Sequence, residues 1–152
     1  MLAGLAVAGG AAMAVAIGAG PAVGQISPPI QTQLQVNSPA TLLAKGSSVN
    51  VSVTASCSGT TAQAGIFLEI TENVSKHIAF GFTESVINCT GTSQTFDLLV
   101  IAGSESPSGL PQGPSKAFAK GVALATASIE ACSPDGITCT NQQIEPTITI
   151  RK

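Results

Sequence analysis

The sequence predicts an all-β protein, an antiparallel β-sandwich of about seven to nine strands that follows an N-terminal signal peptide. Three observations support this expectation. Apolar and polar residues alternate in many short stretches, turn residues separate these stretches, and four cysteines follow an export signal. Short strands combined with a buried cysteine bridge indicate a sandwich of the immunoglobulin-like type.

The first 24 residues are typical of a secretory leader. Residues 2–24 contain no charged side chain and consist mostly of Ala, Gly, Val, Leu and Ile. Ala22 and Gly24 are small residues at which a leader peptidase would cut. The chain therefore divides into a signal peptide at 1–24 and one secreted domain at 25–152. The first positive charge is Lys45, so we expect that a basic start of the leader is missing, and the alternative is an uncharged membrane-spanning segment, since the apolar run is long enough to cross a bilayer.

Composition excludes several classes of partner. Charged residues make up 9% of the chain and the net charge is −2, so no basic patch is available for nucleic acid or an anionic membrane surface. We therefore expect no nucleic-acid partner and no membrane contact beyond the leader. The chain has no Trp or Tyr and only five Phe, which predicts a thin core that needs covalent cross-links.

The four cysteines predict two disulfides. Of three possible connectivities we favour Cys57–Cys89 with Cys132–Cys139, because a Pro-Asp-Gly turn between Cys132 and Cys139 brings these two together. The chain-entropy model gives the short loop about 2.5 kcal/mol and the long loop about 3.7 kcal/mol of stabilisation. A four-cysteine metal site is the alternative, but the sequence has no CxxC pair.

The strands are expected in the following order. A short strand at 34–36 comes first, and residues 49–57 then alternate cleanly, with Cys57 on the apolar face. Further alternation is found at 66–71, 77–82, 87–89, 96–100 and 147–151. Residues 116–131 are rich in Ala, which suits a helix, but period two and β-branched residues favour a strand. In that strand Cys132 faces outward, so its bridge is a surface clip.

Catalytic chemistry is largely missing from the sequence. His77 is the only histidine and falls on a polar face, the acidic residues are scattered, and no nucleophile elbow, phosphate loop or dinucleotide motif occurs. A glycosidase pair of carboxylates is conceivable, but a sugar cleft without Trp or Tyr would be unusual. We expect no enzyme activity, no cofactor and no metal.

Two loops are the predicted recognition elements. One is the irregular stretch 103–115, and the other is the loop closed by Cys132 and Cys139, which its bridge would pre-organise for binding. The candidate contact residues are Ser106, Leu110, Pro111, Gln112, Pro134, Asp135 and Ile137. The alternative is that one loop is a hairpin clip and the other a connection. Three Asn-X-Ser/Thr sequons begin at Asn50, Asn73 and Asn88.

The layout resembles small secreted bacterial immunoglobulin-like proteins with two disulfides. The resemblance is carried by the strand ending in Cys57, by Asn88-Cys89-Thr90-Gly91, and by a short cysteine loop before the last strand. The short loop is similar to that of neocarzinostatin-type apoproteins, and size and bridges are similar to subtilisin-inhibitor-like proteins. The resemblance implies export and a sandwich, without an activity.

Three hypotheses about function follow. The first is a secreted, non-enzymatic binding or surface-structural module whose ligand is an unidentified protein or surface. The second is a secreted protease inhibitor that presents one of the two loops. The third is a subunit of an extracellular assembly, in which residues 25–37 add a strand to the sheet edge of a neighbour.

Overall fold

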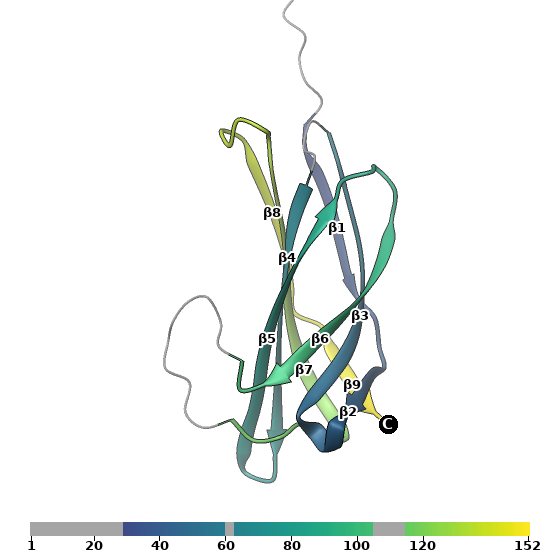
Figure 1. Ribbon diagram of the computed structural model, residues 1–152, viewed down its shortest axis with the longest axis vertical. Helices are drawn as coiled ribbons and strands as arrows, with labels where there is room; N and C mark the ends of the chain where they lie inside the picture. Colours follow the sequence, from purple (N-terminus) through teal and green to yellow (C-terminus); the bar gives the residue numbers. More distant parts are fainter. Residues whose placement is uncertain (1–28, 60–62, 105–114) are drawn as a thin grey trace, which may run out of the picture.

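The computed structural model describes residues 29–59, 63–104 and 115–152, and these contain nine strands and one short 3-10 helix (Figure 1). The predicted leader lies outside the described residues. The elements are β1 (Gln31–Val36), β2 (Ala40–Leu43), η1 (Ala44–Gly46), β3 (Ser48–Ser58), β4 (Gln63–Val74), β5 (His77–Asn88), β6 (Gln94–Ala102), β7 (Gly121–Cys132), β8 (Cys139–Ile144) and β9 (Thr147–Arg151). No helix in the described part of the chain has the length and apolar character needed to span a membrane.

The long antiparallel pairings form two sheets. In the first, β3 pairs with β6 on one side and with both β1 and β2 on the other. In the second, β4 lies between β5 and β7, and β7 also pairs with both β8 and β9. The pairs β1/β2 and β8/β9 each act as one interrupted strand. The predicted immunoglobulin-like sandwich of seven to nine strands is therefore confirmed.

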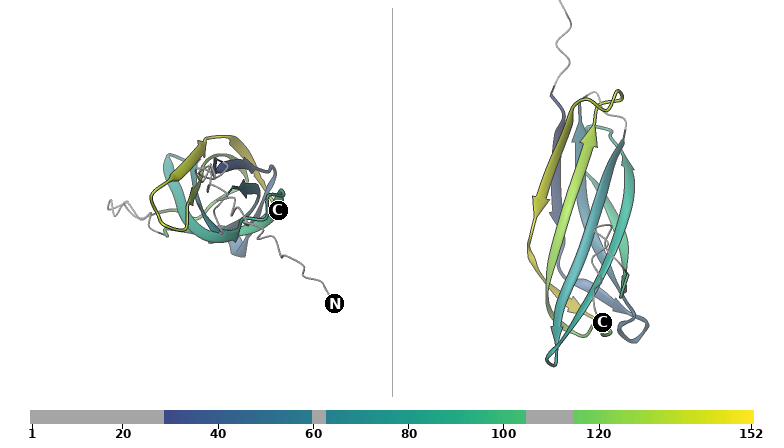
Figure 2. Two further views of the ribbon diagram at one scale, coloured as in Figure 1. Left: turned by 90° about the horizontal axis from the view of Figure 1, so that it is seen from above. Right: turned by 90° about the vertical axis from the view of Figure 1, so that its left-hand side faces the viewer.

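Shorter pairings join the two sheets at one end. β2 runs parallel to β9 over Ala40↔Ile150 and Thr41↔Arg151, and β5 meets β6 only at Gly81↔Ala102 and Phe82↔Ile101. These contacts close the strands into a ring that surrounds the core, as the view from above shows (Figure 2).

The core follows the predicted alternation. The inward residues of β3, from Val49 to Cys57, are at most 2% exposed, and Ile66, Leu68 and Ile70 of β4 are fully buried. In β7 the odd-numbered residues from Ala123 to Ala131 are buried, which confirms a strand in place of a helix. Phe118 is the one phenylalanine within the central core cluster.

Strand β5 differs from the prediction in two ways. It is continuous from His77 to Asn88, where two separate strands were expected. Its inward face carries Ala79 and Ile87, whereas Ile78 is 59% exposed on the outer face. In the first half of β5 the larger apolar side chains therefore lie on the outer side, because the register with β4 places Ala79 and Gly81 inside, and of these larger side chains Phe80 is buried.

Candidate functional site: an open strand seam and a bridged loop

Strands β1 and β8 lie side by side without a hydrogen-bonded ladder between them (Figures 1 and 2). The Asn37 amide donates to the Ser52 carbonyl at 2.8 Å. Hydrogen-bonded pairs recur at every second residue of an antiparallel ladder. The amides and carbonyls of Gln33 and Gln35 therefore point toward β3, and those of Thr32 and Leu34 point toward β8.

The facing edge of β8 is also open. The Ser133 amide donates to the Thr138 carbonyl at 2.7 Å, and the Ala125 amide donates to the Pro146 carbonyl at 3.0 Å. By the same alternation, the backbone groups of Asn141 and Gln143 point away from β7 and toward β1. Two strand edges with free donors and acceptors thus face each other, which is an arrangement that accepts additional strands.

A hollow of about 300 Å³ lies at this seam and is lined by β1, β3, β8 and Ser93. The amide side chain of Gln142 points into it from the inward face of β8. Its Oε1 atom is buried and has no hydrogen-bond partner among the described residues. A buried acceptor without a partner costs stability, so the hollow suits a donor that the isolated chain does not supply.

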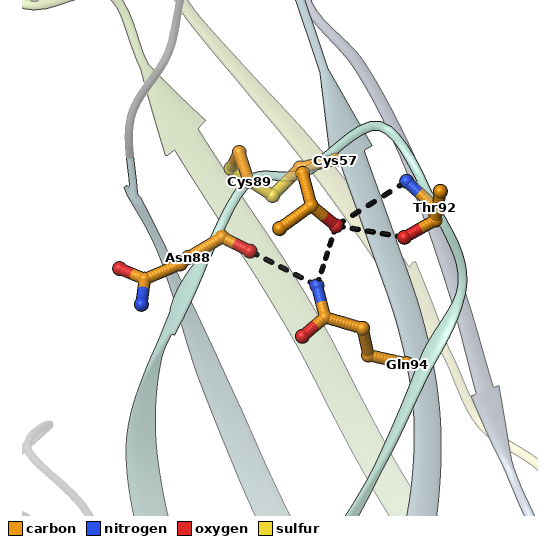
Figure 3. The surroundings of a disulfide bond; sticks show 6 residues. Cys57, Asn88, Cys89, Thr92 and Gln94 are labelled. Atoms are coloured by element: carbon orange, nitrogen blue, oxygen red, sulfur yellow. Dashed lines mark hydrogen bonds between the residues drawn. A yellow bond between two sulfur atoms is a disulfide. The ribbon is translucent and has the colours of Figure 1, made fainter.

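Both predicted disulfides are present at the end of the sandwich near this seam. Cys57 is buried at the end of β3 and bonds to Cys89, which follows β5 and is half-buried. Around this bridge the Gln94 Nε2 donates to the Asn88 carbonyl at 3.1 Å and to the Thr90 hydroxyl at 2.9 Å (Figure 3). The bridge joins the end of β3 to the end of β5, and the Gln94 bonds join β5 to β6 where the β5–β6 ladder has ended.

The loop between Cys132 and Cys139 is compact. The Asp135 carboxylate accepts hydrogen bonds from the Ser133 hydroxyl and from the Ile137 amide. These two bonds, the Ser133 bond first, lower the pKa of Asp135. Gly136 adopts a φ of +71°, and the side chain of Ile137 is 83% exposed. The predicted surface clip is confirmed, and it presents one apolar side chain to solvent.

The other predicted recognition residues, Ser106, Leu110, Pro111 and Gln112, lie outside the described residues. The two flanks of that stretch attach to β5. The Ser104 hydroxyl accepts from the Phe82 amide, and the Ser115 hydroxyl accepts from the Phe80 amide at 3.1 Å. The two serines thereby satisfy part of the free edge of β5.

No catalytic cluster is found among the described residues. His77 is exposed at the start of β5, beside the β4–β5 turn. Glu72 is 3% exposed, and its Oε2 accepts from the Ala119 amide at 2.8 Å. Burial raises the pKa of Glu72, partly offset by this bond. Because Glu72 holds the segment that leads into β7, its position points to a structural role.

One grouping in the described part of the chain has the spacing of a metal site. Glu130, Cys132 and Cys139 place their ligand atoms within 4.8 Å of one another. The two sulfur atoms are bonded to each other, and a metal ligand must be a free thiolate. This grouping therefore does not fit a metal ion.

No protein-family model and no curated protein sequence matches the chain. Among solved structures, the chain is similar to AggA, the major subunit of aggregative adherence fimbriae type I from Escherichia coli. The similarity has 13% sequence identity and a TM-score of 0.41, and it covers 82% of this chain and 96% of AggA. At these values the likeness assigns neither a function nor a mechanism to the chain.

Proposed function

We propose that this protein is a secreted, non-enzymatic subunit of an extracellular assembly. The observation that carries the proposal is the seam between β1 and β8, where two strand edges and a buried unpaired acceptor face a hollow. Strand addition to an open edge gains main-chain hydrogen bonds and is a common means of joining proteins. Two disulfides in a small domain with few charges support an extracellular location.

The expected donor segment must be revised. Residues 25–37 were predicted to reach a neighbour, but Gln31–Val36 forms β1 and pairs with β3 of its own chain. Only residues 25–30 of the predicted mature chain precede β1. In the proposed assembly, an extended segment of one copy pairs with the free edge of β1 in the next copy.

Proline substitutions on the two sides of β1 test this proposal. In Thr32→Pro the amide that is lost faces the seam, so β1 keeps its ladder with β3. We expect the wild-type protein to form oligomers in light scattering after size-exclusion chromatography. We expect Thr32→Pro to remain smaller while its unfolding midpoint stays close to wild type.

Gln33→Pro is the matched control, since it removes an amide that points to Ser56 of β3. It should lower the unfolding midpoint, which distinguishes damage to the fold from a blocked edge. A wild-type protein that stays monomeric at all concentrations would refute strand addition. Oligomers of Thr32→Pro equal to those of wild type would refute it as well.

Recognition through the bridged loop is a second candidate function, favoured by the exposure of Ile137. The disulfide and the Asp135 hydrogen bonds fix this loop before any partner binds, which lowers the entropy lost on binding. A protease inhibitor of this kind would lose inhibition when Ile137 is changed to Ser, while its unfolding midpoint would not change.

A further inference from the structure

The outer face of the second sheet, formed by β4, β5, β7, β8 and β9, is here called the outer sheet face. It exposes four large apolar side chains, which are Ile78, Val86, Val122 and Leu124. Phe67 and Phe82 stack on the same face with ring centroids 6.4 Å apart. Hollows of about 310 Å³ and 160 Å³ flank Phe67. Several exposed apolar side chains on one sheet face, beside two hollows, are typical of an interaction site.

Charges on the outer sheet face are separated along the strands. Three bases lie at the end nearest the β4–β5 turn, and three acids, Glu84, Glu130 and Glu145, lie further from it, while a fourth acid, Glu69, lies in the middle of β4. Three strand positions are each flanked by one base and one acid. Lys76 lies in the turn before β5 and Glu84 on β5, Lys120 directly precedes β7 and Glu130 lies on β7, and Glu145 lies between β8 and β9 and Arg151 at the end of β9. All six side chains are exposed, and no ion pair links them within the described part of the chain.

For each pair, the residue halfway in sequence between the base and the acid lies at nearly the same level across the sheet. These midpoints are Phe80, Ala125 and Ile148. Phe80 pairs with Thr71 of β4, Ala125 pairs with Ile70, and Ile148 connects through Ala123 to Glu72. The three midpoints therefore lie within one residue of Thr71, although the base and the acid are six to ten positions apart in sequence.

This alignment is what a two-fold axis across the strands requires. We propose that two copies of this chain pack their outer sheet faces against each other about an axis through the row of Thr71 and Leu124. Such a rotation keeps each strand opposite its own counterpart and reverses its direction. The base end of each strand then lies over the acid of the same strand in the other copy. Closed two-fold dimers are the commonest symmetric assembly.

The same rotation pairs some of the apolar side chains. Ile78, one row from the bases, is placed over Phe82, whereas Val122 is placed over Thr126. The contact area follows from the size of the face. Four strand positions (β5, β4, β7 and β8/β9), each about ten residues long from the row of Gly65 to the row of Lys76, give a face of roughly 600 Å² per copy. Two such faces bury roughly 1,200 Å², which is within the range of specific interfaces. This dimer rests on the proposed assembly and adds a second contact between copies, separate from the seam between β1 and β8.

Cross-linking at the axis tests the dimer. All four native cysteines are in disulfides, so an introduced cysteine is the single free thiol. Facing sheets lie about 10 Å apart, which is too far for a direct disulfide but within reach of a short bis-maleimide. We expect Leu124→Cys to give a covalent dimer. Leu99→Cys, on the outer face of the other sheet and 48% exposed, is the matched control and should give none.

Charge reversal provides a second, independent test of the dimer. One variant carries Glu84→Lys, Glu130→Lys and Glu145→Lys, and the other carries Lys76→Glu, Lys120→Glu and Arg151→Glu. Each alone should dimerise about 100-fold more weakly than wild type in sedimentation velocity, because like charges then face each other. An equimolar mixture should form a heterodimer, and added salt should weaken it. The protein must be free of glycan at Asn73, which lies on this face.

The outcomes separate this dimer from strand addition. The double variant Thr32→Pro with Leu124→Cys should still give the cross-linked dimer, even if Thr32→Pro abolishes the larger oligomers. Equal cross-linking of Leu124→Cys and Leu99→Cys would refute the axis. Charge variants that each dimerise as wild type does would refute the interface, whatever Thr32→Pro shows. If the two charge-reversal variants, each also carrying Thr32→Pro, assemble into species larger than dimers when mixed, the closed two-fold dimer is refuted and an open-ended contact is indicated.

Discussion

The two ends of the sandwich are closed by different means. At the end near η1, short ladders join β2 to β9 and β5 to β6, and Phe118 fills the space between the sheets. At the opposite end these ladders have stopped, β1 and β8 do not pair with each other, and the two disulfides lie there instead. Covalent bridges are thus found where hydrogen-bonded closure is missing. The end near η1 is therefore closed by main-chain hydrogen bonds, whereas the end with the disulfides leaves the facing edges of β1 and β8 without a strand partner in the described part of the chain.

Hydrogen bonds from several elements meet around Phe118. Its amide donates to the Gly46 carbonyl at 2.8 Å, and the next residue, Ala119, donates to Glu72. Gly46 has a φ of +93°, and a Cβ there would collide with the Phe118 carbonyl. A glycine is therefore required for this close approach.

Phe118→Ala should have the largest effect on stability. Removing a buried ring from the ladder-closed end should lower the free energy of unfolding by about 3–5 kcal/mol, through lost burial and the cavity left behind. Urea unfolding followed by circular dichroism measures this loss. Ile137→Ala, at an exposed position of the other end, should change it by less than about 0.5 kcal/mol. Equal losses in both variants would contradict the proposed role of Phe118.

The disulfide that closes the longer loop should contribute more stability. Cys57→Ala with Cys89→Ala opens a sequence separation of 32, and Cys132→Ala with Cys139→Ala opens one of 7. The chain-entropy model predicts losses of about 3.7 and about 2.5 kcal/mol in the free energy of unfolding. Thermal melts of the two double variants should therefore rank in that order. The reverse ranking would contradict the chain-entropy model and would show that the Cys132–Cys139 bridge stabilises more of the folded protein than the hairpin it closes.

Glu72→Gln should have the smallest effect, and it should depend on pH. The pKa of Glu72 is raised by burial in the folded state, so the folded protein binds more protons than the unfolded chain above the unfolded pKa. Wild-type stability should fall as pH rises from near 4.5, the ordinary pKa of a glutamate, through the raised pKa of Glu72 in the folded state. Glu72→Gln should lack this decline, and Glu130→Gln, on an exposed residue, serves as the control. Parallel stability–pH curves for wild type and Glu72→Gln would contradict the prediction.

Features with a local cause could be predicted from the sequence. Alternation in 49–57 and 66–70 identifies the buried face, because period two is a property of a single strand. The Pro-Asp-Gly turn brought Cys132 to Cys139, and the parity of the strands correctly placed Cys57 inside and Cys132 outside.

Features that depend on pairing between distant strands were missed. Strands β2 and β8 were not predicted, and the β4–β5 turn uses Ser75 and Lys76 with positive φ, without the Asn or Gly that usually indicates such a turn. The alternation at 77–82, with His77 on the polar face, predicts that Ile78, Phe80 and Phe82 point inward, whereas the register with β4 places Ala79 inside.

The sequence by itself determined the all-β architecture, the disulfide pairs and most inward positions, because alternation and turn chemistry act over a few residues. The tertiary structure alone decided where the ring of strands fails to close and which charges share a row. Glu130 and Glu84 belong to different strands, and only the register of β4 with β5 and β7 places them on one face. Register is set by packing across the whole core, so neither the open seam nor the outer sheet face can be found from any single segment.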